Sequence, residues 1–358
     1  GMGMPIGGVI TAEDVLIPNA VGVDIGCGMA YTETGVRAEE LKNIMTGNGN
    51  LVQAIIGDIM RNVPVGFAHH KNPMPSYVLD PALDQMDKNE TDGELLGNLD
   101  AGYFQIGTLG GGNHFIELQE DEEGYLAVMI HSGSRHFGKS VCDYFHQKAR
   151  ALNQKWYSQV PDSFRLAFLP ADSPEGRQYQ NWMQLSMDFA AENREKMMLT
   201  VKAILEKWIG KYTDLTLNFS GEINCHHNYA ALENHRGKEV WVHRKGAVEA
   251  KNGQRAVIPG AMGSYSYVVM GLGNEESFCS SSHGAGRRYS RKGAMEAFRC
   301  EEVILDLERQ GVVLGKKGKA DVAEESRFAY KDIEEVMENQ KDLVIPLKRL
   351  KTIGVVKG

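Results

Sequence analysis

The stretch Phe104-Gln-Ile-Gly-Thr-Leu-Gly-Gly-Gly-Asn-His-Phe-Ile-Glu-Leu118, followed by Leu126-Ala-Val-Met-Ile-His131, decides the fold class of this chain. Short apolar runs alternate here with glycine turns, a pattern that predicts strands over 104–106, 115–118 and 126–131. Residues 177–209 show a different pattern, with apolar side chains recurring about every 3.6 positions, which predicts a long helix packed against a core or an interface. Strands and helices in separate stretches favour an α+β fold.

Working outward, the same signals extend over the whole chain. Residues 1–36 and 214–273 predict further short strands broken by glycine and proline turns. Helices are expected over 139–156, 293–310 and 330–338, whereas the proline-rich stretches 58–98 and 161–176 predict loops. Internal repeats, low-complexity tracts and domain linkers are not apparent, so we predict one large domain of mixed strands and helices over 1–358.

Composition narrows the class of protein. The chain has 358 residues, of which 42% are hydrophobic, with a formal net charge of −8 and five scattered cysteines. We find no apolar run long enough to cross a bilayer and no signal segment. The odd number of cysteines argues against a disulfide framework. These features predict a cytoplasmic protein without membrane attachment.

The acidic charge excludes a protein that relies on non-specific nucleic-acid binding, which is usually basic. Nucleic-acid contact would therefore need a local patch. Two basic runs qualify, Arg287-Arg-Tyr-Ser-Arg-Lys292 and Lys316-Lys-Gly-Lys319, with solvated surface as the alternative for each. The first follows a glycine-rich segment directly, which favours phosphate binding there.

Several polar segments place a metal ligand among residues that bend the backbone. Gly22-Val-Asp-Ile-Gly-Cys-Gly28 offers a carboxylate and a thiolate, and imidazoles come from His114, His131 and the pair His226-His227. Successive strand residues face opposite ways, so one member of that pair is expected to face a shared site. One carboxylate, one thiolate and several imidazoles suit a borderline-soft transition metal and do not suit calcium or magnesium.

Another segment offers a nucleophile. Ser280-Ser-Ser-His-Gly-Ala-Gly-Arg-Arg288 sets His283 before two glycines, whose exposed backbone N–H groups can bind phosphate oxygens. A neutral imidazole can attack phosphorus and form a phosphoramidate, with arginines offsetting the charge. The alternative is a flexible Gly/Ser loop. A second turn of small residues, Ile258-Pro-Gly-Ala-Met-Gly-Ser-Tyr-Ser-Tyr267, could pack against a base or a phosphate.

Taken in order, these segments resemble the RtcB family of RNA ligases, and the resemblance covers almost the whole chain. The motifs that carry it are Val21-Gly-Val-Asp-Ile-Gly-Cys-Gly-Met29, Leu109-Gly-Gly-Gly-Asn-His-Phe-Ile-Glu117, His131-Ser-Gly-Ser-Arg135, Asn224-Cys-His-His-Asn228, His243-Arg-Lys-Gly-Ala247, Pro259-Gly-Ala-Met-Gly263, Ser282-His-Gly-Ala-Gly-Arg-Arg288 and Val356-Lys-Gly358.

The resemblance implies an enzyme that joins RNA ends bearing a 2′,3′-cyclic phosphate or 3′-phosphate to 5′-hydroxyl ends, in tRNA splicing or RNA repair. It implies GTP and two Mn²⁺ ions as cofactors. One ion would be held by Asp24, Cys27 and His114, and the other by Cys27, His131 and His227, with the thiolate bridging them.

His283 is the catalytic residue that the resemblance implies. It would attack the α-phosphorus of GTP, forming a His–GMP intermediate and releasing pyrophosphate. GMP would then pass to the RNA 3′-phosphate, and the 5′-hydroxyl would displace it.

The resemblance also implies a nucleotide site and RNA contacts. Tyr330 would stack on the guanine and Lys357 would donate a hydrogen bond to it, while Arg135, Arg287 and Arg288 would contact RNA phosphates. The other nucleotide-site residues would be Asn113, Phe115, Glu117, Asn228, Pro259, Gly260, Ala261, Met262, Ser266, His283, Gly284, Ala285 and Gly286. The implied partners are RNA, as tRNA halves or broken RNA, and an archease-type activator.

The family pattern includes about fifty residues before the point where this sequence opens with Gly1-Met2, a start that looks like a tag remnant. We therefore expect an N-terminally short RtcB-like catalytic domain. Two alternatives are a metal-dependent phosphoesterase or nucleotide hydrolase on the same scaffold, and a non-catalytic RNA-binding member. The intact metal and nucleophile motifs favour the ligase.

Overall fold

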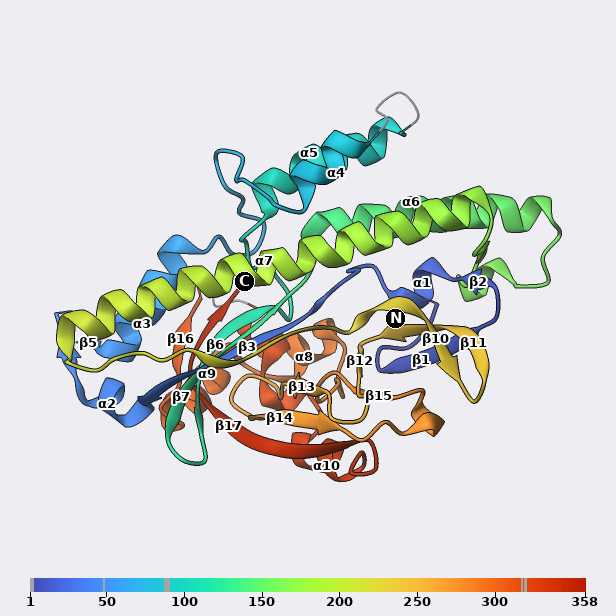
Figure 1. Cartoon of the computed structure of the whole chain (residues 1–358). Coiled ribbons are helices and arrows are strands. Elements are labelled where there is room, and N and C mark those ends of the chain that lie inside the picture. Colours follow the sequence, from blue (N-terminus) through green and yellow to red (C-terminus); the bar gives the residue numbers. More distant parts are fainter. Residues whose placement is uncertain (1–2, 48, 87–90, 317, 319–320) are drawn as a thin grey trace.

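The computed structural model describes residues 3–47, 49–86, 91–316, 318 and 321–358. An eight-stranded sheet lies at its centre, with the strand order β13-β14-β17-β6-β7-β3-β9 and with β16 paired to β17 (Figure 1). Neighbouring strands are antiparallel except for the β16–β17 pair. The strands of this sheet are β3 (Gly28–Arg37), β6 (Phe115–Asp121), β7 (Tyr125–Ser132), β9 (Ser220–His226), β13 (Arg255–Ile258), β14 (Tyr265–Gly271), β16 (Val313–Gly315) and β17 (Val344–Lys357).

Smaller sheets flank the central one. A three-stranded sheet has the order β1-β11-β10, and three further pairs join β12 to β15, β2 to β8 and β4 to β5. Their strands are β1 (Gly8–Ala12), β2 (Val15–Leu16), β4 (Met45–Thr46), β5 (Gly49–Asn50), β8 (Leu169–Pro170), β10 (Asn228–His235), β11 (Lys238–Lys245), β12 (Ala247–Glu249) and β15 (Ser280–Ser282).

The longest helix, α7 (Pro174–Tyr212), runs for 39 residues across the molecule beside α6 (Arg135–Lys155) (Figure 1). It begins where the Ser173 side chain accepts from the Gly176 N–H, with proline at its first position, where no intrahelical donor is needed. The other α-helices are α1 (Pro18–Val21), α2 (Ala38–Asn43), α3 (Leu51–Asn62), α4 (Leu79–Gln85), α5 (Gly93–Gln105), α8 (Arg291–Ala297), α9 (Cys300–Arg309) and α10 (Ile333–Glu338). Short 3-10 turns are η1 (Asp162–Phe164), η2 (Glu275–Ser277), η3 (Val322–Glu325) and η4 (Arg327–Ala329).

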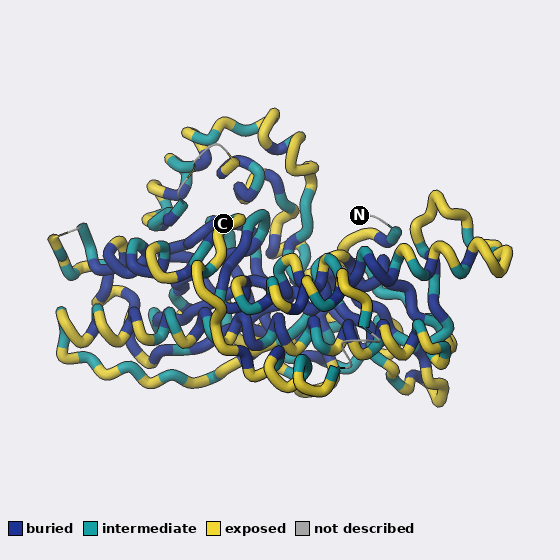
Figure 2. Tube along the Cα trace, turned by 90° about the horizontal axis from the view of Figure 1, so that it is seen from above, coloured by how far each residue is buried: buried dark blue, intermediate teal, exposed yellow. Residues whose placement is uncertain are grey.

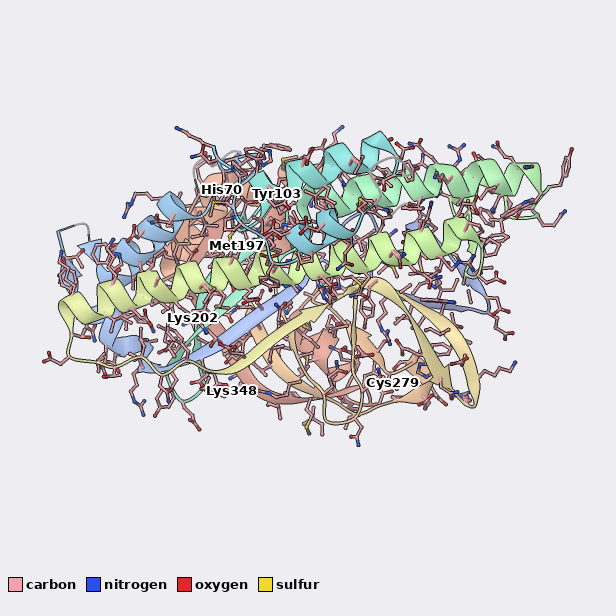
Figure 3. All side chains as sticks on the ribbon, turned by 45° about the horizontal axis from the view of Figure 1, so that its top comes forward. His70, Tyr103, Met197, Lys202, Cys279 and Lys348 are labelled. Atoms are coloured by element: carbon pink, nitrogen blue, oxygen red, sulfur yellow. The ribbon has the colours of Figure 1, made fainter. Side chains whose placement is uncertain are left out.

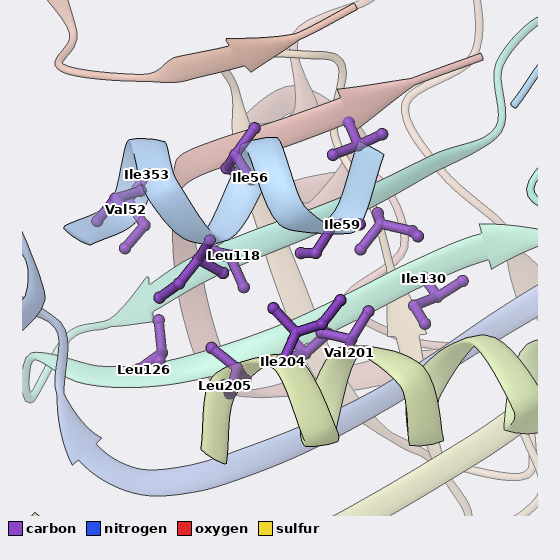
Figure 4. Close-up of a cluster of buried hydrophobic side chains, with 14 of the residues drawn as sticks. Val52, Ile56, Ile59, Leu118, Leu126, Ile130, Val201, Ile204, Leu205 and Ile353 are labelled. Atoms are coloured by element: carbon purple, nitrogen blue, oxygen red, sulfur yellow. The ribbon is translucent and has the colours of Figure 1, made fainter. Parts of the chain in front are cut away.

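The main core lies between α3, α7 and one face of the central sheet. Ile56 of α3 and Val201 and Leu205 of α7 pack there against Leu118 and Ile130 of the sheet (Figure 4). A second cluster covers the other face, where Val303 and Leu307 of α9 pack against Met129 and Val268. The sheet is therefore buried on both faces, and exposed residues follow the outer helices and loops (Figure 2).

Strand register gathers polar motifs at one end of this sheet. Lys357 of β17 pairs with Phe115 of β6, which pairs with His131 of β7, which pairs with Met29 of β3. Met29 in turn pairs with Cys225 of β9. Residues adjoining this row, among them Cys27, His114 and His227, therefore come together although they are far apart in the sequence.

Most expected elements are present, and the α+β class is confirmed. The strand expected over Phe104–Ile106 is wrong, because Phe104 lies in α5. That helix is capped by the Asp92 side chain, which accepts from the Glu94 N–H, and it buries Leu95 and Leu99 at helical spacing.

Two other expectations need correction. The predicted loop 58–98 contains α4 and the start of α5. Pro81 is compatible with α4 because it falls in the first turn, where its missing N–H has no partner to lose. The helix expected over 293–310 is divided into α8 and α9 by an extended Phe298, whose ring packs on Tyr289 and Phe328.

Within the described ranges, each helix is either too short or too polar to span a membrane. Two residues of the basic run Lys316-Lys-Gly-Lys319, Lys317 and Lys319, lie outside the described residues.

Candidate metal centre and nucleotide site

The turn Gly22–Gly28 holds Asp24 and Cys27 at the start of β3. Its backbone is fixed by hydrogen bonds from the Gly26 N–H to the Asn228 carbonyl (2.7 Å) and from the His227 N–H to the Cys27 carbonyl (2.8 Å). A Cβ atom on Gly28 would lie 2.0 Å from the Cys225 carbonyl oxygen, so no larger residue fits. Glycine at this position lets β9 approach and brings His227 to Cys27.

Cys27 lies at the centre of the polar cluster. Its Sγ is 3.5 Å from Nε2 of His114 and 3.4 Å from Nε2 of His131. Asp24 Oδ2 lies 3.2 Å from His114 Nε2. Among the described residues, two groups whose donor atoms lie within 4.8 Å of one another share this thiol: Asp24, Cys27 and His114, and Cys27, His131 and His227.

The far sides of two imidazoles are held by backbone carbonyls. His114 Nδ1 lies 3.0 Å from the Leu109 oxygen and His131 Nδ1 lies 3.1 Å from the Asn113 oxygen. With the proton on Nδ1, each ring directs its Nε2 lone pair at Cys27. Metal-binding histidines are typically oriented in this way.

Hydrogen bonds also orient the Asp24 carboxylate. Its Oδ1 accepts from the Ser134 N–H (3.0 Å) and the Ser134 hydroxyl (3.1 Å). The carboxylate lies so near the backbone of Gly133 that a Cβ atom there would be 2.3 Å from either oxygen. The segment His131-Ser-Gly-Ser-Arg135 therefore supplies one candidate ligand and orients another.

Burial determines the charges in this cluster. It lowers the pKa of His131 and His227 well below the usual value, so both imidazoles are neutral ligands at neutral pH. Burial, assisted by Asp24, also raises the pKa of the Cys27 thiol well above its usual range. For Asp24, burial opposes ionisation but His114 and Arg135 outweigh it, so its pKa is lowered. A bound dication would favour the thiolate, and the mixed S, N and O donors fit a borderline divalent metal.

The two adjacent histidines of the Asn224–Asn228 segment make different contacts. His227 joins the Cys27 cluster, whereas His226 places Nδ1 2.9 Å from the Gly26 carbonyl and 3.2 Å from the Arg194 guanidinium. One ring thus faces the cluster and the other supports the turn that carries Cys27.

His283 follows β15 and reaches the same centre. Its ring lies edge to face with His227, with centroids 4.7 Å apart. Burial lowers the pKa of His283 to about 4, against the opposing effect of a hydrogen bond to the Gly246 backbone. The imidazole is therefore neutral at neutral pH, as a nucleophile must be.

Expected nucleotide residues line the adjoining region. Phe115 packs on His131, with ring centroids 5.5 Å apart, and the Ala285 N–H donates to the Pro259 carbonyl (3.3 Å). That bond joins the segment of small residues 259–262 to the segment 283–286. The Asn228 amide is bound at both ends, since Nδ2 donates to the Asp24 carbonyl and Oδ1 accepts from the Gly246 N–H.

A buried carboxylate lies beside them. Glu117 Oε2 accepts from Gln119 Nε2 (2.6 Å) and from the Thr352 hydroxyl (3.0 Å). The Ser266 hydroxyl accepts from Gln119 and from the Gly260 N–H, both at 3.2 Å. Burial raises the pKa of Glu117 to about 7, although Thr352, Gln119 and Lys357 act in the other direction.

Glu325, which the sequence did not single out, connects the remaining expected residues. Its carboxylate accepts from the Tyr330 hydroxyl (2.6 Å), from Arg287 Nη1 (3.0 Å) and from Lys357 Nζ (3.4 Å). The Lys357 ammonium also lies 5.7 Å from the centre of the Phe115 ring. Arg287 is thus held within this network, half-buried, and its guanidinium lies over the Tyr330 ring.

The other two arginines expected to contact RNA differ from each other. Arg135 is half-buried beside His114, with Nε 3.3 Å from the Thr108 hydroxyl and Nη2 3.3 Å from the Gly66 carbonyl. Arg288 is exposed and lies 3.5 Å from Glu335. Arg135 and Arg287 are thus half-buried and engaged by other groups, whereas Arg288 is exposed.

A second set of unpredicted residues lies on α7. Arg194 is fully buried and donates to the carbonyls of Gly26 and Ser132 (both 2.9 Å) and to Asn224 Oδ1 (2.8 Å). The neighbouring Asn193 donates to the Gly133 carbonyl (3.0 Å). These side chains join three of the polar segments to one rigid helix. The signal available in the sequence was a pair of polar residues within an otherwise apolar stripe.

The family model described as tRNA-splicing ligase RtcB matches residues 1–358. The chain belongs to the RtcB family. It is 37% identical to the RNA-splicing ligase RtcB of Escherichia coli K12 over 377 residues, covering all of this chain and 88% of that protein. The tRNA-splicing ligases RtcB of Archaeoglobus fulgidus and Nanoarchaeum equitans are 32% and 31% identical, and all of this chain aligns with 86% of each. The resemblance seen in the motifs of this RtcB family member is thereby confirmed.

Proposed function

We propose that this RtcB family member is a GTP- and manganese-dependent RNA ligase. It would join a 2′,3′-cyclic phosphate or 3′-phosphate end to a 5′-hydroxyl end, through a His283–GMP intermediate, in tRNA splicing or RNA repair. The observation that carries the proposal is the sharing of Cys27 by two donor groups, with His283 against one of them. The names of the relatives support RNA as the substrate.

Residues 1–358 would act as one catalytic domain. One Mn²⁺ would be held by Asp24, Cys27 and His114, and the other by Cys27, His131 and His227. Such a pair supplies positive charge that neutralises phosphate oxygens and orients the groups that react. The donor set fits because the two oriented imidazoles and the Asp24 carboxylate already face the thiol without rearrangement.

His283 would act as a neutral nucleophile. One ring nitrogen is engaged by the backbone of Gly246, which leaves the lone pair of the other free. Attack on the α-phosphorus forms a P–N bond as the bond to pyrophosphate breaks, and the ring proton stays on the nitrogen bound to Gly246. With a 2′,3′-cyclic end, water would first open the ring to give the 3′-phosphate and a free 2′-hydroxyl. GMP then passes to the RNA 3′-phosphate, and the 5′-hydroxyl oxygen attacks that phosphorus, losing its proton as GMP leaves.

Guanine would be selected beside Glu117 and Lys357. A guanine presents N–H donors to a carboxylate and a carbonyl acceptor to an ammonium, whereas adenine lacks that carbonyl. Tyr330 would stack on the base. Asn113, Phe115, Asn228, Ser266 and the two small-residue segments 259–262 and 283–286 would surround the nucleotide. Arg135, Arg287 and Arg288 remain the proposed RNA phosphate contacts, and tRNA halves or broken RNA and an archease-type activator the proposed partners.

The experiment is incubation with α-labelled GTP and Mn²⁺, followed by a denaturing gel. A protein band that acid removes and alkali leaves would identify a phosphoramidate and support the ligase. Metal binding without a labelled band would overturn the proposed first step. Release of phosphate from RNA ends or nucleotides would then favour the phosphoesterase, and RNA binding alone the non-catalytic member.

A further inference from the structure

A second mixed set of metal-binding side chains lies outside the Cys27 centre. His235 ends β10, Glu275 begins η2, and Cys279 directly precedes β15. Their donor atoms lie within 4.8 Å of one another. His235 Nδ1 is 2.9 Å from Glu275 Oε2, and Cys279 Sγ is 3.7 Å from Glu275 Oε1. Figure 3 shows Cys279 near the hairpin formed by β10 and β11, and His235 is the last residue of β10 before the turn.

The far side of the His235 ring is held by a buried carboxylate. His235 Nε2 lies 3.0 Å from Glu233 Oε2. Glu233 is itself paired with the fully buried Arg244, whose Nη1 and Nη2 both donate to it. When Nε2 donates its proton to Glu233, the Nδ1 lone pair faces Glu275, whose other oxygen lies 3.7 Å from Cys279 Sγ. A carboxylate behind the imidazole is the usual support of a metal-binding histidine.

We propose that His235, Glu275 and Cys279 bind one Zn²⁺ ion. Sulfur, imidazole and carboxylate donors are those of tetrahedral zinc sites, and hard ions such as Mg²⁺ prefer oxygen alone. Zinc bonds of about 2.0 to 2.3 Å put tetrahedral donors about 3.3 to 3.5 Å apart. The measured separations involve both oxygens of Glu275, 2.9 Å from Nδ1 to Oε2 and 3.7 Å from Sγ to Oε1, and one donor atom of each residue lies within 4.8 Å of the other two. Rotation of these side chains would bring the three donors to one ion. Water would take the fourth position on the side where Glu275 is half-exposed.

The ion would link two segments of the chain. It would join the tip of the β10–β11 hairpin to the segment that enters β15, and His283 follows β15 directly. Arg244 already connects the same parts, donating to the Phe278 carbonyl (3.0 Å) and the Ser280 hydroxyl (2.9 Å). Zinc would replace the thiol proton of Cys279 and the hydrogen bond between His235 and Glu275, so its affinity would rise with pH.

The experiment is a zinc titration of the full chain in competition with a chromophoric chelator. Glu275→Gln removes a ligand from a half-exposed side chain, and Cys279→Ser removes the thiolate. Each should lose one zinc equivalent, or bind it about tenfold or more weakly, while equivalents that depend on Cys27 remain. Cys300→Ser, a cysteine outside the cluster, is the matched control and should keep wild-type stoichiometry.

Two results make the outcome decisive. Cys27→Ser should lose other equivalents and keep this one, so the site is distinguished from the proposed catalytic metals whether or not the protein ligates RNA. Unchanged stoichiometry and affinity in Glu275→Gln would overturn the proposal, because the cluster would then be an ion pair between a protonated His235 and its two carboxylates. That variant keeps the test valid if Cys279→Ser does not fold.

Discussion

The imidazole rings of His227 and His283 lie edge to face with their centroids 4.7 Å apart. His227 also belongs to the group that shares Cys27, whereas His283 hydrogen-bonds the backbone of Gly246. The proposed ligand and the proposed nucleophile are therefore in contact but are held by different parts of the chain. Substitutions should separate their roles.

His283→Ala should abolish labelling of the protein by α-labelled GTP and leave its manganese content at the wild-type level. The reason is that His283 supplies the nucleophilic nitrogen and belongs to neither donor group. Gel labelling and elemental analysis of the same preparation check the two halves of this expectation. Residual labelling would show that another side chain is the nucleophile.

Cys27→Ala should remove both metals rather than one, because both donor groups depend on the same Sγ. The expected manganese content falls to near zero, and labelling falls with it. Cys142→Ala offers a buried cysteine outside both groups as the control. Retention of one full metal equivalent would show that Cys27 does not bridge.

How much of the fold could be predicted depended on the length of each pattern. The periodic stretch 177–209 is long enough to identify α7, and the continuous apolar run 126–131 identifies β7. Three residues at Phe104–Ile106 are too few to separate a strand from the end of a helix. The break between α8 and α9 was not predictable, because it depends on the packing of Phe298 against residues distant in sequence.

The residues of the candidate site also differ in whether a local sequence pattern marks them. Asp24, Cys27, His114 and His131 were found because glycine turns beside donor residues form a local signal. Glu325 and Arg194 carry no such signal, since a glutamate or arginine in a helical turn is ordinarily solvated. Their burial results from the register of β17, which brings Lys357 to Glu325, and from the path of α7, which brings Arg194 to backbone carbonyls of other segments.

Glu325→Gln should weaken the proposed guanine site. Lys357 is buried and would lose its carboxylate partner, and Tyr330 and Arg287 would lose theirs. Loss of one member of a buried ion pair costs about 3 kcal/mol or more, and some of that loss should appear as a raised KM for GTP. Glu324→Gln is the matched control, because Glu324 contacts Arg287 through its backbone carbonyl, which the substitution leaves in place. Urea unfolding and labelling at graded GTP concentrations test both variants. Equal unfolding free energies and equal KM values for GTP in the two variants would contradict the role of Glu325.

Arg194→Met should destabilise the fold by about 2 to 5 kcal/mol, because the carbonyls of Gly26 and Ser132 would remain buried without their donor and each such group costs about 1 to 3 kcal/mol. These carbonyls adjoin Cys27 and His131, so metal affinity should fall as well. Arg177→Met changes an exposed arginine on the same helix and should alter the unfolding free energy by about 0.5 kcal/mol or less. Chemical denaturation and manganese titration compare the two, and a small effect in Arg194→Met would exclude Arg194 as a positioning residue.

His243 predicts a specific dependence of stability on pH. Its Nε2 accepts from the Ile17 N–H (3.0 Å) and its Nδ1 donates to the Trp241 carbonyl (3.1 Å), so a second proton on Nε2 would face a donor. Burial lowers the pKa of His243 to about 4, from an ordinary value near 6.5. A depressed pKa means that the unfolded state binds the proton more readily. The stabilisation is thus complete above pH 6.5 and is lost as the pH falls from 6.5 toward 4.

His243→Gln should remove this contribution, because a glutamine amide can donate and accept but does not titrate. From the shift in pKa, about 2 kcal/mol of the stability that the wild-type protein loses between pH 7 and pH 5 should be absent in the variant. Urea unfolding at the two pH values measures it, and the other buried histidines titrate alike in both proteins. His136→Gln, at an exposed histidine, should keep the wild-type loss. If His243→Gln loses as much stability between pH 7 and pH 5 as the wild-type protein does, the hydrogen bond from Ile17 does not hold His243 in its neutral form.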